Sequence, residues 1–276
     1  MQIAMINDRV IPYEQLEPAY LDRGLYFGDG VYEVLRSYNG KIFALDEHMN
    51  RFSHSLAAIG IETVDVNDIR DHVLDAFKKS EIRNARIYFH ITRGSSSRSH
   101  SWPDDIKPNF FMTITQLEDS GKVKANGIAV STYPDLRWKR CDIKSLNLLA
   151  NVLAYQDAKK KGCDESILVN DAGFITEGSS SSFFAIINGS LRTTPLTSNI
   201  LPSITRGYVL KAAQSIGVPF EEKSITTEQA KSADELFIAV TTKDIVPIVK
   251  FDDVSISDGR PGKITARLIE QFKQYT

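Results

Sequence analysis

The chain has 276 residues, of which 42% are hydrophobic and 25% charged, an ordinary composition for a globular protein. Its formal net charge of -2 gives no electrostatic reason to expect nucleic acid or an anionic membrane as a partner. This length allows one large domain or two smaller ones, and we expect two, with enough buried surface that neither a metal nor disulfides are needed.

Several features bear on where the protein works. No apolar run approaches the ~18 residues of a membrane-spanning helix, and the N-terminus lacks the basic start and apolar core of a signal peptide. The two cysteines, Cys141 and Cys163, fit a reducing compartment and have no metal-ligand spacing. We therefore expect a soluble cytoplasmic protein.

The first elements are short strands and a glycine-rich bend. Strands are predicted over residues 3–6 and 10–12, joined by a turn. Glycines cluster over residues 24–30 and precede a predicted strand over 31–38. Because these glycines come before a strand and do not open a helix after one, they are not a dinucleotide fingerprint. The segment is either a functional bend or a hairpin that needs its glycines only for the turn.

A helix is predicted from residue 45 to residue 56, where apolar residues recur at helical spacing. The same spacing places His48, Arg51 and Ser55 together on a neighbouring face. Arg51 is therefore a candidate anion ligand, and the alternative is a solvated arginine. A second amphipathic helix is predicted over 68–79.

A long polar loop separates two predicted strands, 85–92 and 109–116. Loops of this length inside a compact domain are often functional. Arg98 and His100, two apart in an extended loop, have side chains that can point to the same side and bind a carboxylate. The alternative is a flexible, serine-rich loop with incidental charges.

The polar segment after these strands is interpreted as a domain junction. We expect a small N-terminal domain over residues 1–118, a linker over 119–126 and a large C-terminal domain over 127–276. The second domain opens with a predicted strand over 128–132.

Lys144 lies between a basic, aromatic run at 137–140 and a helix predicted over Ser145 to Lys161. A lysine among cations and apolar groups has a lowered pKa and keeps a lone pair for imine formation with a carbonyl. The alternative is a surface lysine in a basic loop.

Glu177 and the serines that follow it lie between a predicted strand over 166–169 and another over 183–187. The carboxylate is placed to bind a ring nitrogen, and the serine hydroxyls and amides are placed to bind a phosphate. The alternative is an ordinary polar turn.

A predicted helix from residue 204 to about 216 begins directly after a turn. The amides of Ile204 and Thr205 then lie at a helix N-terminus, which is a ready anion site, unless the Thr205 hydroxyl serves only as a cap. A capping box is predicted at 226–229, and a strand over 235–240 leads to a polar end that contains Thr241. The chain closes with a predicted helix over 261–273.

Together these segments resemble the class IV, or fold type IV, pyridoxal-phosphate aminotransferases, and among them most closely the D-amino acid aminotransferases. The resemblance runs from residue 22 to the C-terminus. It rests on Phe27–Glu33, Arg98–His100, Arg137–Leu149 and Thr176–Ser181. It implies an α+β fold of two domains with the cofactor at the domain interface.

The resemblance also implies a role for each candidate residue. Lys144 would carry the cofactor as a Schiff base and move the substrate proton, while Glu177 would keep the ring nitrogen protonated. The remaining cofactor-binding residues would be Arg51, Ser179, Ser180, Ser181, Ile204, Thr205 and Thr241.

Tyr32, Arg98 and His100 would form the trap for the substrate carboxylate, with the Arg98 loop supplied by the partner subunit of a homodimer. The chain departs from the family pattern at Ser182, Ser203 and Val240, in or beside the expected phosphate site.

The implied reaction is transamination between D-amino acids, such as D-alanine and D-glutamate, and 2-oxo acids, such as pyruvate and 2-oxoglutarate. One alternative is another activity of this fold: transamination of branched-chain L-amino acids or amines, or aminodeoxychorismate lyase chemistry. Another is a non-catalytic protein that binds a phosphate ligand on the same scaffold.

Overall fold

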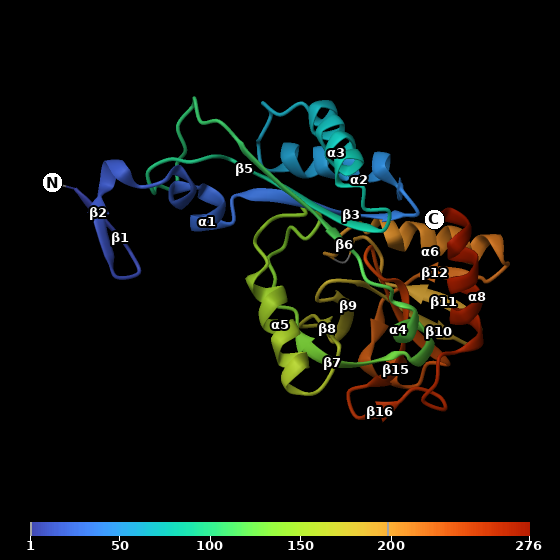
Figure 1. Cartoon of the computed structure of the whole chain (residues 1–276). Helices are drawn as coiled ribbons and strands as arrows, with labels where there is room; N and C mark the ends of the chain where they lie inside the picture. Colours follow the sequence, from blue (N-terminus) through green and yellow to red (C-terminus); the bar gives the residue numbers. More distant parts are fainter. Residues whose placement is uncertain (1, 198) are drawn as a thin grey trace.

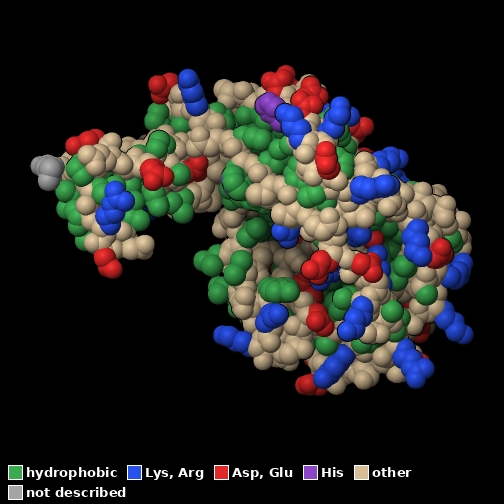
Figure 2. Space-filling view, viewed as in Figure 1, with side chains coloured by type: hydrophobic (Ala, Val, Ile, Leu, Met, Phe, Trp, Pro, Cys, Tyr) green, Lys and Arg blue, Asp and Glu red, His purple; other side chains and the backbone are tan. Residues whose placement is uncertain are grey.

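The computed structural model describes residues 2–197 and 199–276. Its architecture is α+β, with two sheets and a projecting N-terminal arm (Figure 1). The arm begins with a hairpin of β1 (Ile3–Ile6) and β2 (Arg9–Pro12), followed by the 3-10 turns η1 (Tyr13–Gln15) and η2 (Pro18–Leu21) and the short helix α1 (Arg23–Phe27). Figure 2 shows hydrophobic side chains gathered over this arm.

The smaller sheet is antiparallel, and its strands lie in the order β4, β3, β5, β6. The bounds are β3 (Gly30–Tyr38), β4 (Lys41–Ile42), β5 (Ala85–Thr92) and β6 (Asn109–Gln116). Helices α2 (Leu45–Ala58) and α3 (Val66–Ser80) cover the face that points away from the rest of the molecule (Figure 1). The predictions of β3, β5, β6, α2 and α3 are confirmed, whereas β4 was not predicted.

The two faces of β3 have different environments. Val31 and Leu35 are fully buried and belong to the apolar core formed with α2 and α3. Tyr32 and Arg36 point to the opposite face, because side chains alternate along a strand. One strand therefore contributes both to the core of the smaller sheet and to the surface that faces the larger one.

The larger sheet has ten strands, in the order β12, β11, β10, β14, β15, β7, β8, β9, β13, with β16 paired to β15. Its strands are β7 (Ile128–Pro134), β8 (Glu165–Val169), β9 (Phe174–Gly178), β10 (Ser182–Ile187), β11 (Ser190–Thr193), β12 (Phe220–Glu222), β13 (Ile225–Thr226), β14 (Glu235–Val240), β15 (Asp244–Phe251) and β16 (Val254–Ser255). Its helices are α4 (Gly121–Asn126), α5 (Leu149–Lys160), α6 (Ile204–Ser215), α7 (Thr227–Lys231) and α8 (Lys263–Phe272), followed by η3 (Lys273–Tyr275).

Apolar side chains cover both faces of this sheet. On one face, α6 and α8 pack on β10 and β14 through Val209, Leu268 and Phe237. On the other face, a second apolar core includes Phe183 and Phe251. The predicted capping box at the start of α7 is present, because the side chains of Thr226 and Gln229 each bond the backbone of the other residue.

One expectation about secondary structure is wrong. The helix predicted to begin at Ser145 begins at Leu149. The intervening residues instead pair with β3: Ser145 forms a bridge with Val31, and the Leu146 amide donates to the Gly30 carbonyl at 2.9 Å. Strand β15 was not among the predicted elements. Its Pro247 pairs with β14 and precedes Ile248, the first residue that pairs with β7.

Candidate active site

A cavity of about 610 Å³ lies between the two sheets, and its lining includes Lys144. β3 and β5 contribute Tyr32 and Arg86, while the larger sheet contributes Glu177 and Ser182. Figure 2 shows the surface hollowed between the upper and lower parts of the molecule. Of the residues predicted for the site, the lining includes Tyr32, Arg51, Lys144, Glu177, Ser179, Ser180, Ser181 and Thr241.

Lys144 is held by its backbone. Its amide donates to the Ser55 hydroxyl on α2 at 3.1 Å, and its carbonyl accepts from the Tyr32 amide on β3 at 3.0 Å. Its Nζ lies 4.2 Å from the centre of the Tyr32 ring, a cation–π distance. The side chain is half-buried and lines the cavity, so the alternative of a lysine in a solvated basic loop is wrong.

Glu177 is buried beside the cavity and accepts a hydrogen bond from Arg137. The Leu201 amide donates to it at 3.2 Å. Burial raises the pKa of Glu177, while the Arg137 guanidinium and the Leu201 N–H oppose that rise. Asp135 accepts from Arg137 on its other side at 2.7 Å. Arg137 was predicted only as part of the basic run before Lys144, and its pairing with Glu177 was not predicted, since residues forty apart show no local signal of contact.

Arg51 is buried, so the alternative of a solvated arginine is wrong. Its Nε and Nη2 each donate to Glu33 at 2.8 Å, and Nη1 donates to the Pro202 carbonyl at 3.2 Å. His48 Nδ1 lies 2.7 Å from the same carboxylate. Burial by itself would raise the pKa of Glu33, but Arg51 and His48 outweigh it and hold that pKa well below its usual range. A guanidinium has more N–H groups than these bonds use, so Arg51 can still bind an anion.

Glu33 was not among the predicted site residues, although a signal for it exists in the sequence. It lies two residues from both Val31 and Leu35 and therefore shares their face of the strand, which is the buried one. A buried carboxylate needs a cation, and the cationic residues on the adjacent helix supply it.

The N-terminus of α6 lies next to the end of β14. Ser203, and not Thr205, is the N-cap: its hydroxyl accepts from the Arg206 amide at 3.2 Å. The Thr205 hydroxyl instead lies 3.5 Å from that of Thr241. Ser203 and Thr241 line the cavity, and the amides of Ile204 and Thr205 are in the first turn of α6, where N–H groups have no carbonyl of their own helix to bind.

The serine run surrounds a buried carboxylate that sequence reasoning missed. The hydroxyls of Ser180 and Ser181 donate to Glu165 at 2.7 and 3.1 Å, and Ser179 donates to the same group. All three serines line the cavity, but these hydrogen bonds already occupy their hydroxyls. The Ser182 hydroxyl is buried and has no partner within residues 2–197 and 199–276.

Arg98 and His100 do not line the cavity of their own chain. Both lie against the ring of Phe27, with Arg98 Cζ 5.3 Å and the His100 ring 5.7 Å from its centre. The buried guanidinium of Arg23 donates to the carbonyls of Ser99 at 2.6 Å and His100 at 3.1 Å. The loop therefore has a defined shape set by Arg23, and both predicted side chains are exposed on it.

The cavity thus combines the Lys144 amine, the Glu177 carboxylate with its partner Arg137, and the Arg51 guanidinium near the N-terminus of α6. Within the described ranges, no group of three or more histidine, cysteine or acidic side chains is arranged to hold a metal ion, and no helix has the length and apolar character needed to cross a membrane.

Comparison with known proteins gives a consistent match. The family model described as amino-transferase class IV matches residues 30–251. A D-alanine aminotransferase of Staphylococcus haemolyticus is 38% identical over 277 aligned residues, covering 100% of this chain and 98% of the relative. A branched-chain amino acid aminotransferase of Escherichia coli has a similar structure, with a TM-score of 0.87 and 24% identity, over 97% of this chain and 92% of that one. A branched-chain amino acid aminotransferase of T.th., solved with pyridoxamine 5'-phosphate, has a TM-score of 0.86 and 23% identity over the same shares.

Proposed function

The chain belongs to the amino-transferase class IV family, and from this premise we propose that it transfers amino groups between D-amino acids, of the D-alanine and D-glutamate type, and 2-oxo acids such as pyruvate and 2-oxoglutarate. Enzymes of this family depend on pyridoxal phosphate, and so does this one. The observation that carries the proposal is a half-buried lysine inside the cavity of a chain 38% identical, over its whole length, to a D-alanine aminotransferase.

The residues of the cavity fit pyridoxal phosphate. An aldehyde needs an amine, which Lys144 supplies, and a pyridine nitrogen needs an acidic partner, which Glu177 supplies. A phosphate needs cationic and N–H donors, which Arg51 and the first amides of α6 supply. A cavity of about 610 Å³ also has room for the cofactor and a small substrate.

We propose that the phosphate is held by Arg51, the backbone of Ile204 and Thr205, and the Thr241 hydroxyl. Ser179, Ser180 and Ser181 would contribute through backbone groups at the cavity wall, because Glu165 already accepts from their hydroxyls. Ser203 supports this site by capping α6.

The bound cofactor supplies an electron-withdrawing ring that makes the α-hydrogen of an amino acid acidic. Lys144 Nζ takes this proton and returns it during the transfer. Tyr32 lies directly beside the amine and limits the positions open to it. Arg137 and the Leu201 amide stabilise the charge of Glu177 and so oppose the rise in its pKa that burial causes.

We propose that Tyr32 forms the trap for the substrate carboxylate together with Arg98 and His100 of the partner subunit of a homodimer. The exposed position of Arg98 and His100 on a shaped loop, outside their own cavity, supports this arrangement. Exposed apolar side chains on α5, beside the cavity, give the partner a surface to cover: Leu149, Val152 and Leu153.

The domain division and the location are also proposals. The smaller sheet ends at Gln116 and the larger one begins at Ile128, which supports domains of residues 1–118 and 127–276 around a junction at 119–126. The free thiols of Cys141 and Cys163 support a cytoplasmic location.

The deciding experiment is the absorbance spectrum of the purified protein before and after D-alanine, and separately after L-alanine and L-leucine. We expect the cofactor band to shift with D-alanine and to persist with both L-amino acids. An equal response to L-leucine would replace the proposal with branched-chain transamination, and a protein without a cofactor band would point to the non-catalytic alternative.

A further inference from the structure

A second, smaller cavity of about 150 Å³ lies beside Asp244, the residue that follows the turn joining β14 to β15. This turn comprises Thr241, Thr242 and Lys243 and is closed by the Lys243 amide, which donates to the Val240 carbonyl at 3.1 Å. All three residues of the turn line the large cavity that contains Lys144, whereas Asp244, the next residue, lines the small cavity.

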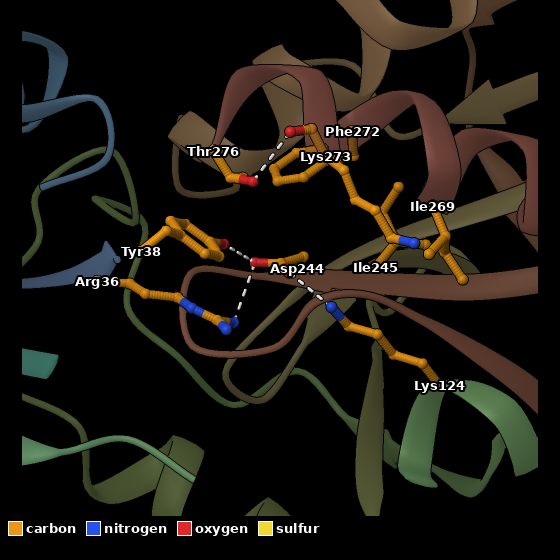
Figure 3. A pocket seen from close by; sticks show the side chains of 9 residues that line it. All are labelled: Arg36, Tyr38, Lys124, Asp244, Ile245, Ile269, Phe272, Lys273 and Thr276. Carbon is orange, nitrogen blue, oxygen red and sulfur yellow. Dashed lines mark hydrogen bonds and ion pairs between the residues drawn. The ribbon is translucent and has the colours of Figure 1, made fainter. Parts of the chain in front are cut away.

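Two cationic side chains and a tyrosine hydroxyl converge on Asp244, at the end of this turn (Figure 3). Arg36 Nη1 lies 3.2 Å from this carboxylate, Lys124 Nζ donates to it at 2.6 Å, and the Tyr38 hydroxyl also donates to it. Burial and the nearby Asp244 raise the pKa of Tyr38 far above its usual range, so its hydroxyl stays protonated and donates. These partners come from β3 and α4, elements distant in sequence from the turn.

Arg36 also bonds the turn directly. The same Nη1 donates to the Thr242 carbonyl at 2.9 Å. Asp244, the residue that follows the turn, has a φ of 59°. Such a conformation is costly for a residue other than glycine and persists where its surroundings hold it. The turn is therefore held from behind by one guanidinium that bonds both its backbone and the carboxylate at its end.

We propose that Arg36 is a positioning residue for phosphate binding: through the Thr242 carbonyl and Asp244 it holds the Thr241 turn in the conformation that receives the cofactor's phosphate. This inference rests on the proposed function, since it takes Thr241 to be a phosphate ligand. It extends that function by assigning a role to a residue outside the cavity and to the cluster behind it.

The chemistry predicts a specific signature. Without Arg36 the turn has lost a charge-assisted bond, and Asp244 keeps only Lys124 and Tyr38. The loss should weaken binding of a ligand that carries a phosphate and leave binding of the same ligand without it unchanged. Pyridoxal phosphate and pyridoxal differ by this group alone, so their dissociation constants isolate the effect.

The test uses the full-length protein, stripped of its cofactor and titrated with each ligand by absorbance. We expect Arg36→Met to raise the dissociation constant for pyridoxal phosphate by about tenfold or more and the one for pyridoxal by less than about twofold, as for loss of a charge-assisted hydrogen bond. Arg36→Lys keeps the charge and should recover part of the affinity, while Tyr38→Phe should cause a smaller loss.

Lys273→Met is the matched control, because Lys273 lines the same small cavity but bonds Glu270 at 2.6 Å, away from the turn. Thermal unfolding of each stripped variant identifies any that fail to fold. If Arg36→Met does not fold, the dissociation constants of Arg36→Lys and Tyr38→Phe for the two ligands are compared with those of the wild type instead. Equal losses for both ligands, or an unchanged preference for pyridoxal phosphate in Arg36→Met, would overturn the inference. A wild-type protein that does not prefer pyridoxal phosphate over pyridoxal would instead overturn the proposed phosphate site.

Discussion

Glu177 and Arg137 form a buried ion pair at the wall of the cavity that contains Lys144. The carboxylate expected to meet the cofactor's ring nitrogen thus has a cation of its own. Because Arg137 opposes the effect of burial, its removal should raise the pKa of Glu177 further.

The first prediction concerns Arg137→Met. With a higher pKa, Glu177 becomes protonated at a higher pH, so the acid limb of the kcat/KM profile should move toward neutral pH. Breaking a buried pair should also lower the free energy of unfolding by roughly 3 kcal/mol. Arg140→Met is the control, since Arg140 is exposed and bonds Asp142. An acid limb that does not move would show that Glu177 does not depend on Arg137.

The second prediction concerns Lys144 and Arg98, which we expect two subunits to contribute to one active site. Lys144→Ala should reduce turnover by about 10²-fold or more, as expected for removal of a proton-transfer group, and Lys139→Ala in the same loop should not. Arg98→Ala should mainly raise KM, because Arg98 contributes binding.

Mixing these two variants tests where Arg98 acts. If Arg98 serves the neighbouring subunit, hybrid dimers of Lys144→Ala and Arg98→Ala contain one intact site, and about a quarter of all sites in a fully exchanged mixture become active. Activity at low substrate should then exceed that of either variant alone. No gain after subunit exchange would place Arg98 outside the partner's site.

The third prediction concerns acid stability. The pKa of Glu33 lies below its ordinary value of 4.5, so this group stabilises the fold above about pH 4.5 and loses that contribution as the pH falls further. Glu33→Gln should cost roughly 3 kcal/mol at neutral pH and make unfolding less dependent on pH in the acid range. Urea unfolding across a pH series measures both effects. Asp46→Asn, which affects an exposed pair with Arg70, should match the wild type, and a steep acid dependence that survives in Glu33→Gln would contradict the assignment.

The fourth prediction concerns the cap of α6. Ser203→Ala should lower the free energy of unfolding by about 1 kcal/mol, and Ser203→Gly by only a few tenths, because glycine is itself a fair N-cap. Urea unfolding checks this order. Thr205→Ala should cost less than Ser203→Ala, since its hydroxyl faces Thr241 and does not cap the helix. The reverse order would make Thr205 the cap.

Local patterns predicted much of the fold. Helical spacing over 45–56 and the strand predicted over 85–92 specified elements that the structure confirms, because each buries one regular face. The strand predicted over 109–116 is also confirmed, although only Met112 and Ile114 pack against the core and both are partly buried. The start of α5 was not predictable in this way. The residues after Lys144 suit a helix, but long-range pairing of Ser145 with Val31 holds them extended.

The candidate site, like the fold, could be predicted from the sequence only in part. Lys144, Glu177 and Arg51 were predicted as individual residues, and all line one cavity. The contacts of these residues were not predicted, because each contact joins separate elements. They are the contacts of Glu177 with Arg137, of Arg51 with Glu33, and of the serines with Glu165. Only Glu33 carried a usable signal, as an acid on the buried face of a strand.

On one face of strand β3, Glu33 bonds Arg51. On the other face, Tyr32 lies beside Lys144, and Arg36 bonds the carbonyl of Thr242 in the Thr241 turn. Adding or deleting one residue here would exchange the faces and misplace all of these contacts together. The strand therefore leaves no room for insertions or deletions.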